Sequence, residues 1–147
     1  MINKNIGFDR FKNINKRGIE NEIKKIKQKY ELVFHWLEIE ISNKDIIDFF
    51  YDRSVKSVAI YGMNDLGYML YKKLVNSEVN VKYAIDNGII TLGRDEIKTV
   101  YIDDILEPVD MIIVAAIYQY ESDCIKKVIE QRISTQVISL EELIYSF

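Results

Sequence analysis

Hydrophobic and polar residues follow two different periods along the chain, and the change of period divides it. In the first part the apolar positions are four and three residues apart in turn: Ile19, Ile23, Ile26, Tyr30, Val33 and Leu37. We call these residues the apolar stripe. Their spacing predicts an amphipathic helix over residues 19–41. Residues 1–18 show no sustained period and are expected to form a mobile arm.

The apolar stripe has two interpretations. Its spacing is the heptad spacing of a coiled coil, at about the shortest length for which that spacing is meaningful. Phe34 and Trp36 widen the stripe near its end, which favours packing of the later turns on the rest of the chain. The earlier turns stay available to a second copy, so packing within one chain and dimerisation both remain open.

Beyond residue 42 the pattern is that of strands alternating with helices. A short helix over 44–52, capped by Ser42 or Asn43, comes first. Strands are then expected at 56–61, 81–85, 99–102, 111–116 and 136–139, and helices at 66–76, 122–132 and 141–145. Because parallel strands need long crossovers, residues 42–147 are predicted to form one Rossmann-like α/β domain. Its parallel sheet has the order 3-2-1-4-5, is flanked by helices, and carries an N-terminal helical extension.

The segment VAIYGMNDLGYML, residues 58–70, carries the candidate binding chemistry. A G-x-G-x-x-G turn uses its glycines for a tight bend, for close approach of a pyrophosphate and for close packing of helix on strand. Gly62 and Gly67 occupy the first and third places, and Asn64 occupies the second. Turn amides would face phosphate, and the acid ending the next strand would face a ribose. The candidate cofactor-binding residues are Gly62, Met63, Asn64, Asp65, Leu66, Gly67, Asp86 and Asn87.

Two features of this turn weigh against a phosphate ligand. Asn64 places a side chain where a pyrophosphate would lie. Asp65 puts a carboxylate in the first turn of the following helix, where it can cap the free N–H groups and compete with phosphate for them. A nucleotide or nucleotide-sugar ligand and a purely structural turn therefore stay equally open, while the missing middle glycine disfavours NAD(P).

The segments SVAIYGMNDLGYMLYKKL, VKYAIDNG, EPVDMIIVAA and VISLEEL follow one another in this order. Over residues 45–144 the chain resembles the small Rossmann-like, NAD(P)-binding-like domains of bacterial surface and capsular polysaccharide biosynthesis. Such domains occur alone, attached to glycosyltransferases, or at the N-terminus of sugar acetyltransferases. The resemblance implies that Gly62, Asn64, Gly67 and Asp86 meet a nucleotide or nucleotide-linked sugar.

Composition excludes several other classes of function. A formal net charge of −3 gives no general attraction to nucleic acid or to anionic lipid. No apolar run reaches the length of a membrane span, and the polar start lacks the core of a signal peptide, so a cytoplasmic location is expected. With one cysteine, Cys124, and one histidine, His35, the chain has no internal disulfide and no zinc-site spacing. We interpret His35 as structural and Cys124 as a buried, inert thiol, and we expect no metal and no catalytic residue.

Three smaller groups of residues have structural interpretations beside functional ones. Tyr68 and Lys72 have the Y-x-x-x-K spacing of short-chain dehydrogenases and epimerases, but they directly follow the glycine turn, so we attribute the spacing to chance. An acidic group is interpreted as helix caps and solvated charges: Asp103, Asp104, Glu107 and Asp110. Tyr118 and Tyr120 follow the fourth strand, where a ring could stack on a base.

The sequence thus predicts a non-catalytic nucleotide- or nucleotide-sugar-binding module of a bacterial surface-polysaccharide pathway. One alternative is an interaction or oligomerisation module with a vestigial nucleotide turn, whose helix over 19–41 contacts a second copy or a glycosyltransferase. Another alternative is an NAD-dependent oxidoreductase or epimerase. The missing middle glycine and the misplaced Tyr68 and Lys72 count against the enzyme.

Overall fold

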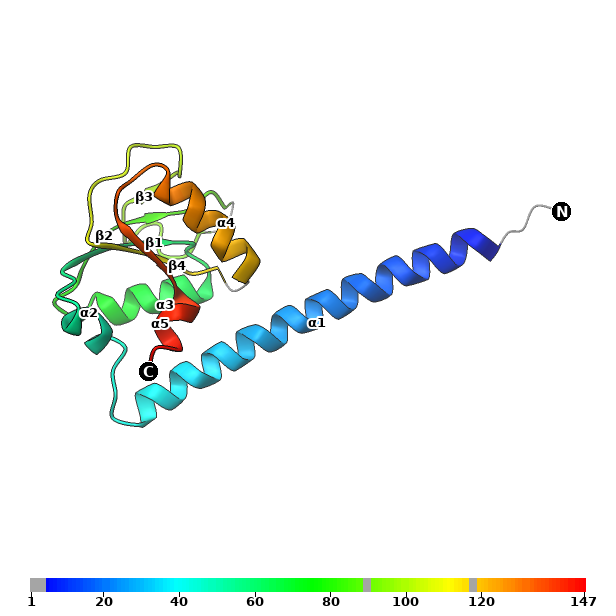
Figure 1. The fold of residues 1–147 in the computed structure, drawn as a ribbon, viewed down its shortest axis with the longest axis horizontal. Helices are drawn as coiled ribbons and strands as arrows, with labels where there is room; N and C mark the ends of the chain where they lie inside the picture. Colours follow the sequence, from blue (N-terminus) through cyan, green and yellow to red (C-terminus); the bar gives the residue numbers. More distant parts are fainter. Residues whose placement is uncertain (1–4, 89–90, 117–118) are drawn as a thin grey trace.

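An all-parallel sheet of five strands carries helices on both faces, and one long helix projects from it (Figure 1). The structure is a computed structural model that describes residues 5–88, 91–116 and 119–147, with side chains for 15–88, 91–116 and 121–147. The strands are β1 (Ser57–Tyr61), β2 (Asn80–Ile85), β3 (Thr99–Val100), β4 (Met111–Val114) and β5 (Gln136–Ser139). Their order, β3-β2-β1-β4-β5, confirms the predicted Rossmann-like topology.

Two of the five described helices form crossovers between strands, and together the helices cover the two faces of the sheet. They are α1 (Asn5–Ile41), α2 (Asp48–Asp52), α3 (Asp65–Leu74), α4 (Gln119–Glu130) and α5 (Leu140–Ile144). Alternate strand residues face opposite sides, so Ile60 and Ile113 join the core cluster under α3 and α5, while Ile112 joins the cluster under α4. All four residues of β4 are buried, as expected of a central strand covered on both faces.

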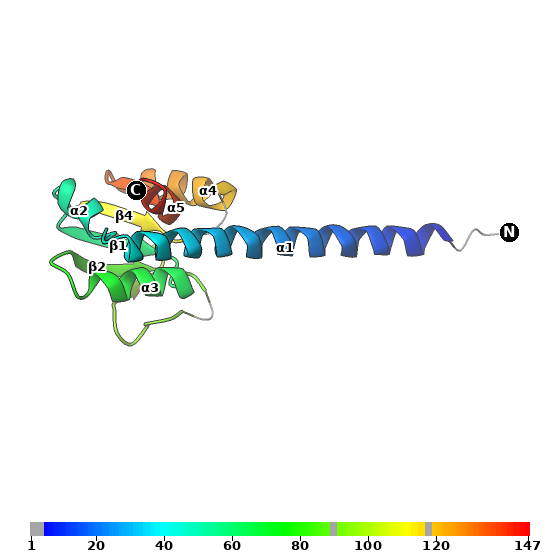
Figure 2. The ribbon, with the colours of Figure 1, turned by 90° about the horizontal axis from the view of Figure 1, so that it is seen from below.

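Helix α1 is longer than the sequence pattern predicts. It begins at Asn5, so residues 5–18 continue the helix instead of forming an irregular arm; residues 1–4 lie outside the described residues. Once a helix has nucleated, each further residue adds a hydrogen bond at low cost, and a polar segment without periodicity can therefore prolong it. Figure 2 shows the N-terminal part of α1 extending well beyond the sheet.

The C-terminal part of α1 packs on residues 42–147, which we call the α/β body. Leu32 and Ile39 are 3% and 4% exposed and belong to the same core cluster as Leu143 of α5. The Lys73 ammonium lies 2.7 Å from Glu40 Oε2, which ties α3 to the end of α1. These contacts fix the direction in which α1 leaves the body.

The turn after α1 corrects one predicted cap. Asn43 adopts the left-handed conformation, with φ of 60°, and Ser42 Oγ donates to the Ile39 carbonyl, so both residues end α1. The next helix, α2, begins at Asp48 without a side-chain cap at its N-cap residue, Ile47. Ser42 and Asn43 therefore terminate one helix and do not start the next.

Candidate functional site

Both glycines of the turn between β1 and α3 are required by the backbone. Gly62 has φ of 88°, a conformation that side-chain-bearing residues rarely adopt. A Cβ placed on Gly67 would lie 1.9 Å from the Gly62 carbonyl oxygen, so helix and strand approach here as closely as glycine allows. The turn has the bend and the close packing expected from the first and third glycines of the nucleotide-binding pattern.

The amides of this turn already donate to groups of the protein. The Gly62 N–H donates to the Ile85 carbonyl at 2.9 Å, and the Met63 N–H donates to Asp86 Oδ2 at 2.7 Å. The Leu66 N–H lies 3.0 Å from Asp65 Oδ1. These donors lie where a phosphate would bind, so a ligand at this turn has to compete with bonds that the folded chain makes for itself.

Asn64 caps α3 and bridges the two central strands. Its backbone is extended, with φ of −74° and ψ of −174°, and its Oδ1 accepts from the Gly67 N–H at 2.9 Å. Its Nδ2 donates to the carbonyl of Ala115, directly after β4, at 2.9 Å. Asn64 is thus the N-cap residue of α3, while Asp65 accepts from the first-turn N–H of Leu66, as predicted, and also forms an ion pair with Lys29 of α1.

Asp86 uses both carboxylate oxygens on backbone amides. Besides the Met63 bond, its Oδ1 accepts from the Gly88 N–H at 2.6 Å. The neighbouring Asn87 accepts from the Ile102 N–H through its Oδ1 at 3.3 Å. A hollow of about 410 Å³ borders Asp86 on the β3 side, where Arg94 and Tyr101 also line it. The acid predicted to meet a ribose lies beside an open space, and each of its oxygens already accepts one backbone N–H.

The charge around the switch point between β1 and β4 is negative. Burial raises the pKa of the Tyr61 hydroxyl at the end of β1, and the carboxylates of Asp86 and Glu121 raise it further. Like charges disfavour an added anion. These two carboxylates disfavour a phosphate beside Tyr61, while the cationic Arg94 lines the neighbouring hollow.

Tyr68 and Lys72 meet on a shared acid. The Tyr68 hydroxyl donates to Glu96 Oε1 at 2.6 Å, and the Lys72 ammonium lies 3.3 Å from Glu96 Oε2. The hydrogen bond to Glu96 raises the pKa of Tyr68. Tyrosine chemistry of the epimerase type needs that pKa lowered, so this trio holds the segment around Glu96 against α3 and does not activate a proton transfer.

The remaining candidates have structural roles. The His35 ring stacks on Tyr145 at a centroid distance of 4.9 Å, as expected of a structural histidine. Asp104 accepts from the Tyr101 N–H within a turn, and Asp110 accepts from the amides of Lys56 and Ser57 at the start of β1, so neither of them forms the predicted helix cap. Asp103 and Glu107 form ion pairs with Arg132 and Lys98.

Cys124 corrects the sequence prediction, because its thiol is exposed and not buried. The side chains of Tyr118 and Tyr120 lie outside the described residues. Across the described parts of the chain, no group of three or more His, Cys, Asp or Glu residues is arranged to hold a metal ion. Within the same residues, no helix is both long and apolar enough to cross a bilayer.

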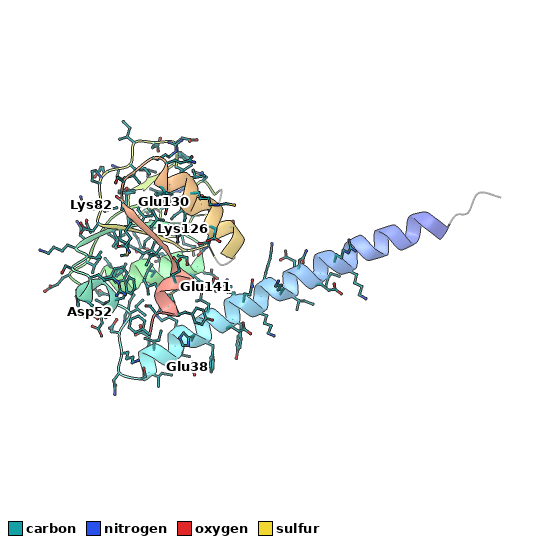
Figure 3. All side chains as sticks on the ribbon, in the orientation of Figure 1. Glu38, Asp52, Lys82, Lys126, Glu130 and Glu141 are labelled. Carbon is teal, nitrogen blue, oxygen red and sulfur yellow. The ribbon has the colours of Figure 1, made fainter. Side chains whose placement is uncertain are left out.

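The apolar stripe is the second candidate site, and it is exposed along its whole length. The exposed fraction of its residues runs from 42% at Val33 to 67% at Ile26. Trp36, one of the two residues that widen the stripe, packs against the core, so the later turns of α1 contact the body as predicted, whereas Phe34 is 50% exposed. Figure 3 shows the side chains of the outer part of α1 pointing into open space, while Glu38 marks the part beside the body.

A different face of α1 contacts the body. Leu32, Trp36 and Ile39 lie on it, buried or half-buried, four and three residues apart. This second row has the same spacing as the apolar stripe and is only one position away from it, so the sequence pattern did not separate the two. The face that contacts the body is short, whereas the apolar stripe continues along α1 beyond the body.

An apolar groove runs between α1 and α3, next to the inner end of the apolar stripe. Its volume is about 220 Å³, and its lining comes from both helices: Val33, Trp36, Leu37, Glu40, Leu66 and Met69. Met69 of α3 is 56% exposed in this groove. The exposed apolar surface of α1 therefore continues onto the body.

Comparisons of the chain with protein-family models, with curated proteins and with solved structures gave no match. The function is therefore argued from the geometry of the chain itself.

Proposed function

We propose that the chain is a self-association module in which α1 pairs with α1 of a second copy through the apolar stripe. The observation that carries the proposal is the exposure of all six stripe residues, each at least 42% open to solvent. Contiguous apolar surface of this kind marks an interaction site, since large uncovered patches are rare on monomers. The α/β body is then the unit that pairing brings together.

The period of the stripe favours a second copy of the same helix as its occupant. Positions alternately four and three apart keep a 3.5-residue repeat, which stays in line when two like helices supercoil. Oppositely charged residues flank the stripe, with Glu20 and Glu22 followed by Lys27 and Lys29. A helix beyond the body also gains from pairing, because isolated helices in water are only marginally stable.

The glycine turn supports the same proposal by contrast. Three of its donors, the N–H groups of Met63, Gly67 and Leu66, already bond to Asp86, Asn64 and Asp65, so a ligand would compete with the protein's own groups there. The residues of the apolar stripe are as regularly spaced in the sequence, but no other part of the chain that the structure describes covers them. Of the two regions, the helix is the one that a partner would stabilise most.

The proposal is tested by sedimentation equilibrium over a range of protein concentrations. The intact chain is expected to sediment as a dimer, and the double variant Ile19→Glu with Ile26→Glu as a monomer. The matched control, Asn21→Glu with Gln28→Glu, adds the same two charges on the opposite face of α1 and should stay dimeric. Circular dichroism confirms that each variant is folded; an intact chain that is monomeric at every concentration disproves the proposal.

A second candidate function keeps the nucleotide or nucleotide-sugar ligand of a surface-polysaccharide pathway. The hollow of about 410 Å³ beside Asp86 and the glycine geometry favour it. A phosphate at the turn would compete with Asp86 for the Met63 N–H. A thermal-shift panel of UDP-sugars, CDP, NAD, NADP and coenzyme A tests it, since a ligand that binds only the folded state raises the melting temperature. No shift across the panel removes this candidate.

A further inference from the structure

We infer that the two copies pair in parallel and in register, and that Ile41 of each copy enters the groove between α1 and α3 of the other. This inference rests on the proposed self-association and adds its geometry. Heptad positions follow from the stripe, with Ile23, Tyr30 and Leu37 at a and Ile19, Ile26 and Val33 at d. The residues beside the stripe then distinguish the ways in which two such helices can pair.

A parallel, in-register pair satisfies both the apolar and the charged positions. Each stripe residue meets its own counterpart, so all six layers are apolar. In parallel pairs a g residue faces the e residue five positions later on the partner, which brings Glu22 to Lys27 of the second copy. The two side chains are 68% and 74% exposed, and their ion pairs within the described residues are exposed ones on their own helix, Glu22 with Lys25 at 3.4 Å and Lys27 with Glu31 at 3.9 Å. Two-fold symmetry forms the pair between copies twice.

Antiparallel pairing with full overlap of the stripe has a charge defect. Antiparallel helices place e against e and g against g. With all six stripe residues paired in reverse order, Lys27 faces Lys27 of the second copy, and Lys29, which also pairs with Asp65 of its own chain, faces Lys29. Like charges at these positions are unfavourable. This antiparallel register therefore places like charges together, whereas the parallel register pairs opposite charges.

Antiparallel registers shifted by one heptad have an apolar defect. In one direction the shift brings Val33 opposite Lys16, and in the other it brings Ile23 opposite Glu40. Either shift replaces apolar layers by layers that bury a charged residue against a hydrocarbon side chain. The parallel register alone among these four pairs every stripe residue with an apolar partner and opposite charges with each other.

The groove explains the apolar residue at the end of α1. Ile41 is 72% exposed, although its e position normally carries a polar residue in a coiled coil. Trp36 is at g, so parallel pairing brings Ile41 of the second copy to the groove that Trp36 lines with Leu66 and Met69. The groove is open and apolar, and Ile41 is the residue that parallel pairing delivers to it. The two bodies then lie at the same end of the helical pair.

Disulfide trapping tests the orientation. In a Cys124→Ser background, Ile19→Cys should give a covalent dimer under mild oxidation, because parallel pairing places the two cysteines together. The matched control Asn21→Cys points away from the partner and should remain uncrosslinked. A dimer by sedimentation in which Ile19→Cys does not crosslink, but an Ile19→Cys copy mixed with a Leu37→Cys copy does, overturns the parallel arrangement and leaves self-association standing. A monomeric chain overturns both.

A second pair of variants tests the groove. Ile41→Glu is expected to raise the dimer dissociation constant about tenfold or more, equivalent to about 1.4 kcal/mol. Val75→Glu, which replaces an apolar residue that is 51% exposed outside the groove, should leave that constant unchanged. Circular dichroism and the melting temperature of the body serve as folding controls. An unchanged dissociation constant for Ile41→Glu overturns the docking of this residue in the groove.

Discussion

The glycine turn and the apolar stripe differ in how far the chain satisfies each from its own residues. At the turn, the amides of Met63 and Gly67 and the oxygens of Asp86 all have partners within the protein. Along the stripe, large apolar side chains of α1 remain exposed, including Ile26 at 67%. The first region has the known motif and several donors bound within the protein, whereas the second has a regular spacing and an exposed apolar surface.

The difference shows that a recognisable sequence motif does not by itself indicate a site that is free to bind a partner. A nucleotide turn keeps its shape for reasons of backbone geometry, because Gly62 and Gly67 are needed for the bend and the close approach whether or not a ligand binds. The apolar stripe does not stabilise the fold of a single chain in this way, because it lies on a helix that extends past the α/β body. Substitutions that perturb the glycine turn and the apolar stripe separately therefore test whether the two regions differ in this way.

The largest effect is expected from Gly67→Ala, which disrupts the close packing of α3 on the glycine turn. The added methyl group would collide with the Gly62 backbone, so we expect a loss of about 3 kcal/mol or more in the free energy of unfolding. Urea denaturation measures it. Gly18→Ala is the matched control, because nothing lies within 4 Å of its Cβ and alanine favours a helix. A Gly67→Ala protein as stable as the original would refute the close approach.

The next effect separates the two faces of α1. Leu32→Ala removes a side chain that is 3% exposed and should cost roughly 2 to 3 kcal/mol of unfolding free energy. Leu37→Ala removes the same atoms at a position that is 53% exposed; it should leave the unfolding of the monomer nearly unchanged and weaken the dimer. Urea denaturation and sedimentation equilibrium distinguish the two outcomes. Equal losses of folding stability would contradict the assignment of the faces.

A smaller effect is expected from Asp86→Asn. Asparagine keeps one acceptor oxygen, while the carboxylate serves both the Met63 and the Gly88 amides, so one donor loses its partner. The expected cost is about 1 kcal/mol of unfolding free energy. Asp95→Asn, on an exposed residue of the neighbouring segment, is the control. If Asp86→Asn leaves stability unchanged and allows a nucleotide to bind, the carboxylate blocks a site instead of completing the turn.

The smallest effect is a dependence of stability on pH at Asp110. Hydrogen bonds from the backbone amides of Lys56 and Ser57 lower the pKa of its carboxylate. Because the folded-state pKa lies below the unfolded value of about 3.9, this stabilisation is complete above that value and is lost as pH falls through the folded pKa. Asp110→Asn should reduce the loss of unfolding free energy between neutral and acidic pH, measured by urea denaturation. An unchanged pH profile would show that the carboxylate contributes nothing.

Much of the α/β body was predictable from the sequence, because its strands and helices have strong local signals. The buried run at Met111 to Val114 and the glycine turn led to the observed strand order. The extent of α1 was not predictable from period alone, since residues 5–18 are helical without an apolar repeat. The hydrogen-bond partner of Asp86 was not predictable from the sequence either, because the Met63 amide lies next to Asp86 only when β1 and β2 pair.

By itself the sequence determined the parallel α/β fold, the positions that require glycine and the heptad period of α1, because each depends on spacing along the chain. Only the tertiary structure decided that the row containing Leu32 docks and the stripe containing Ile26 stays exposed, and that Asp86 occupies the turn. Local spacing specifies which side of an element is apolar or which turn is tight. What covers that side, or bonds to that turn, depends on residues distant in sequence that the fold brings into contact.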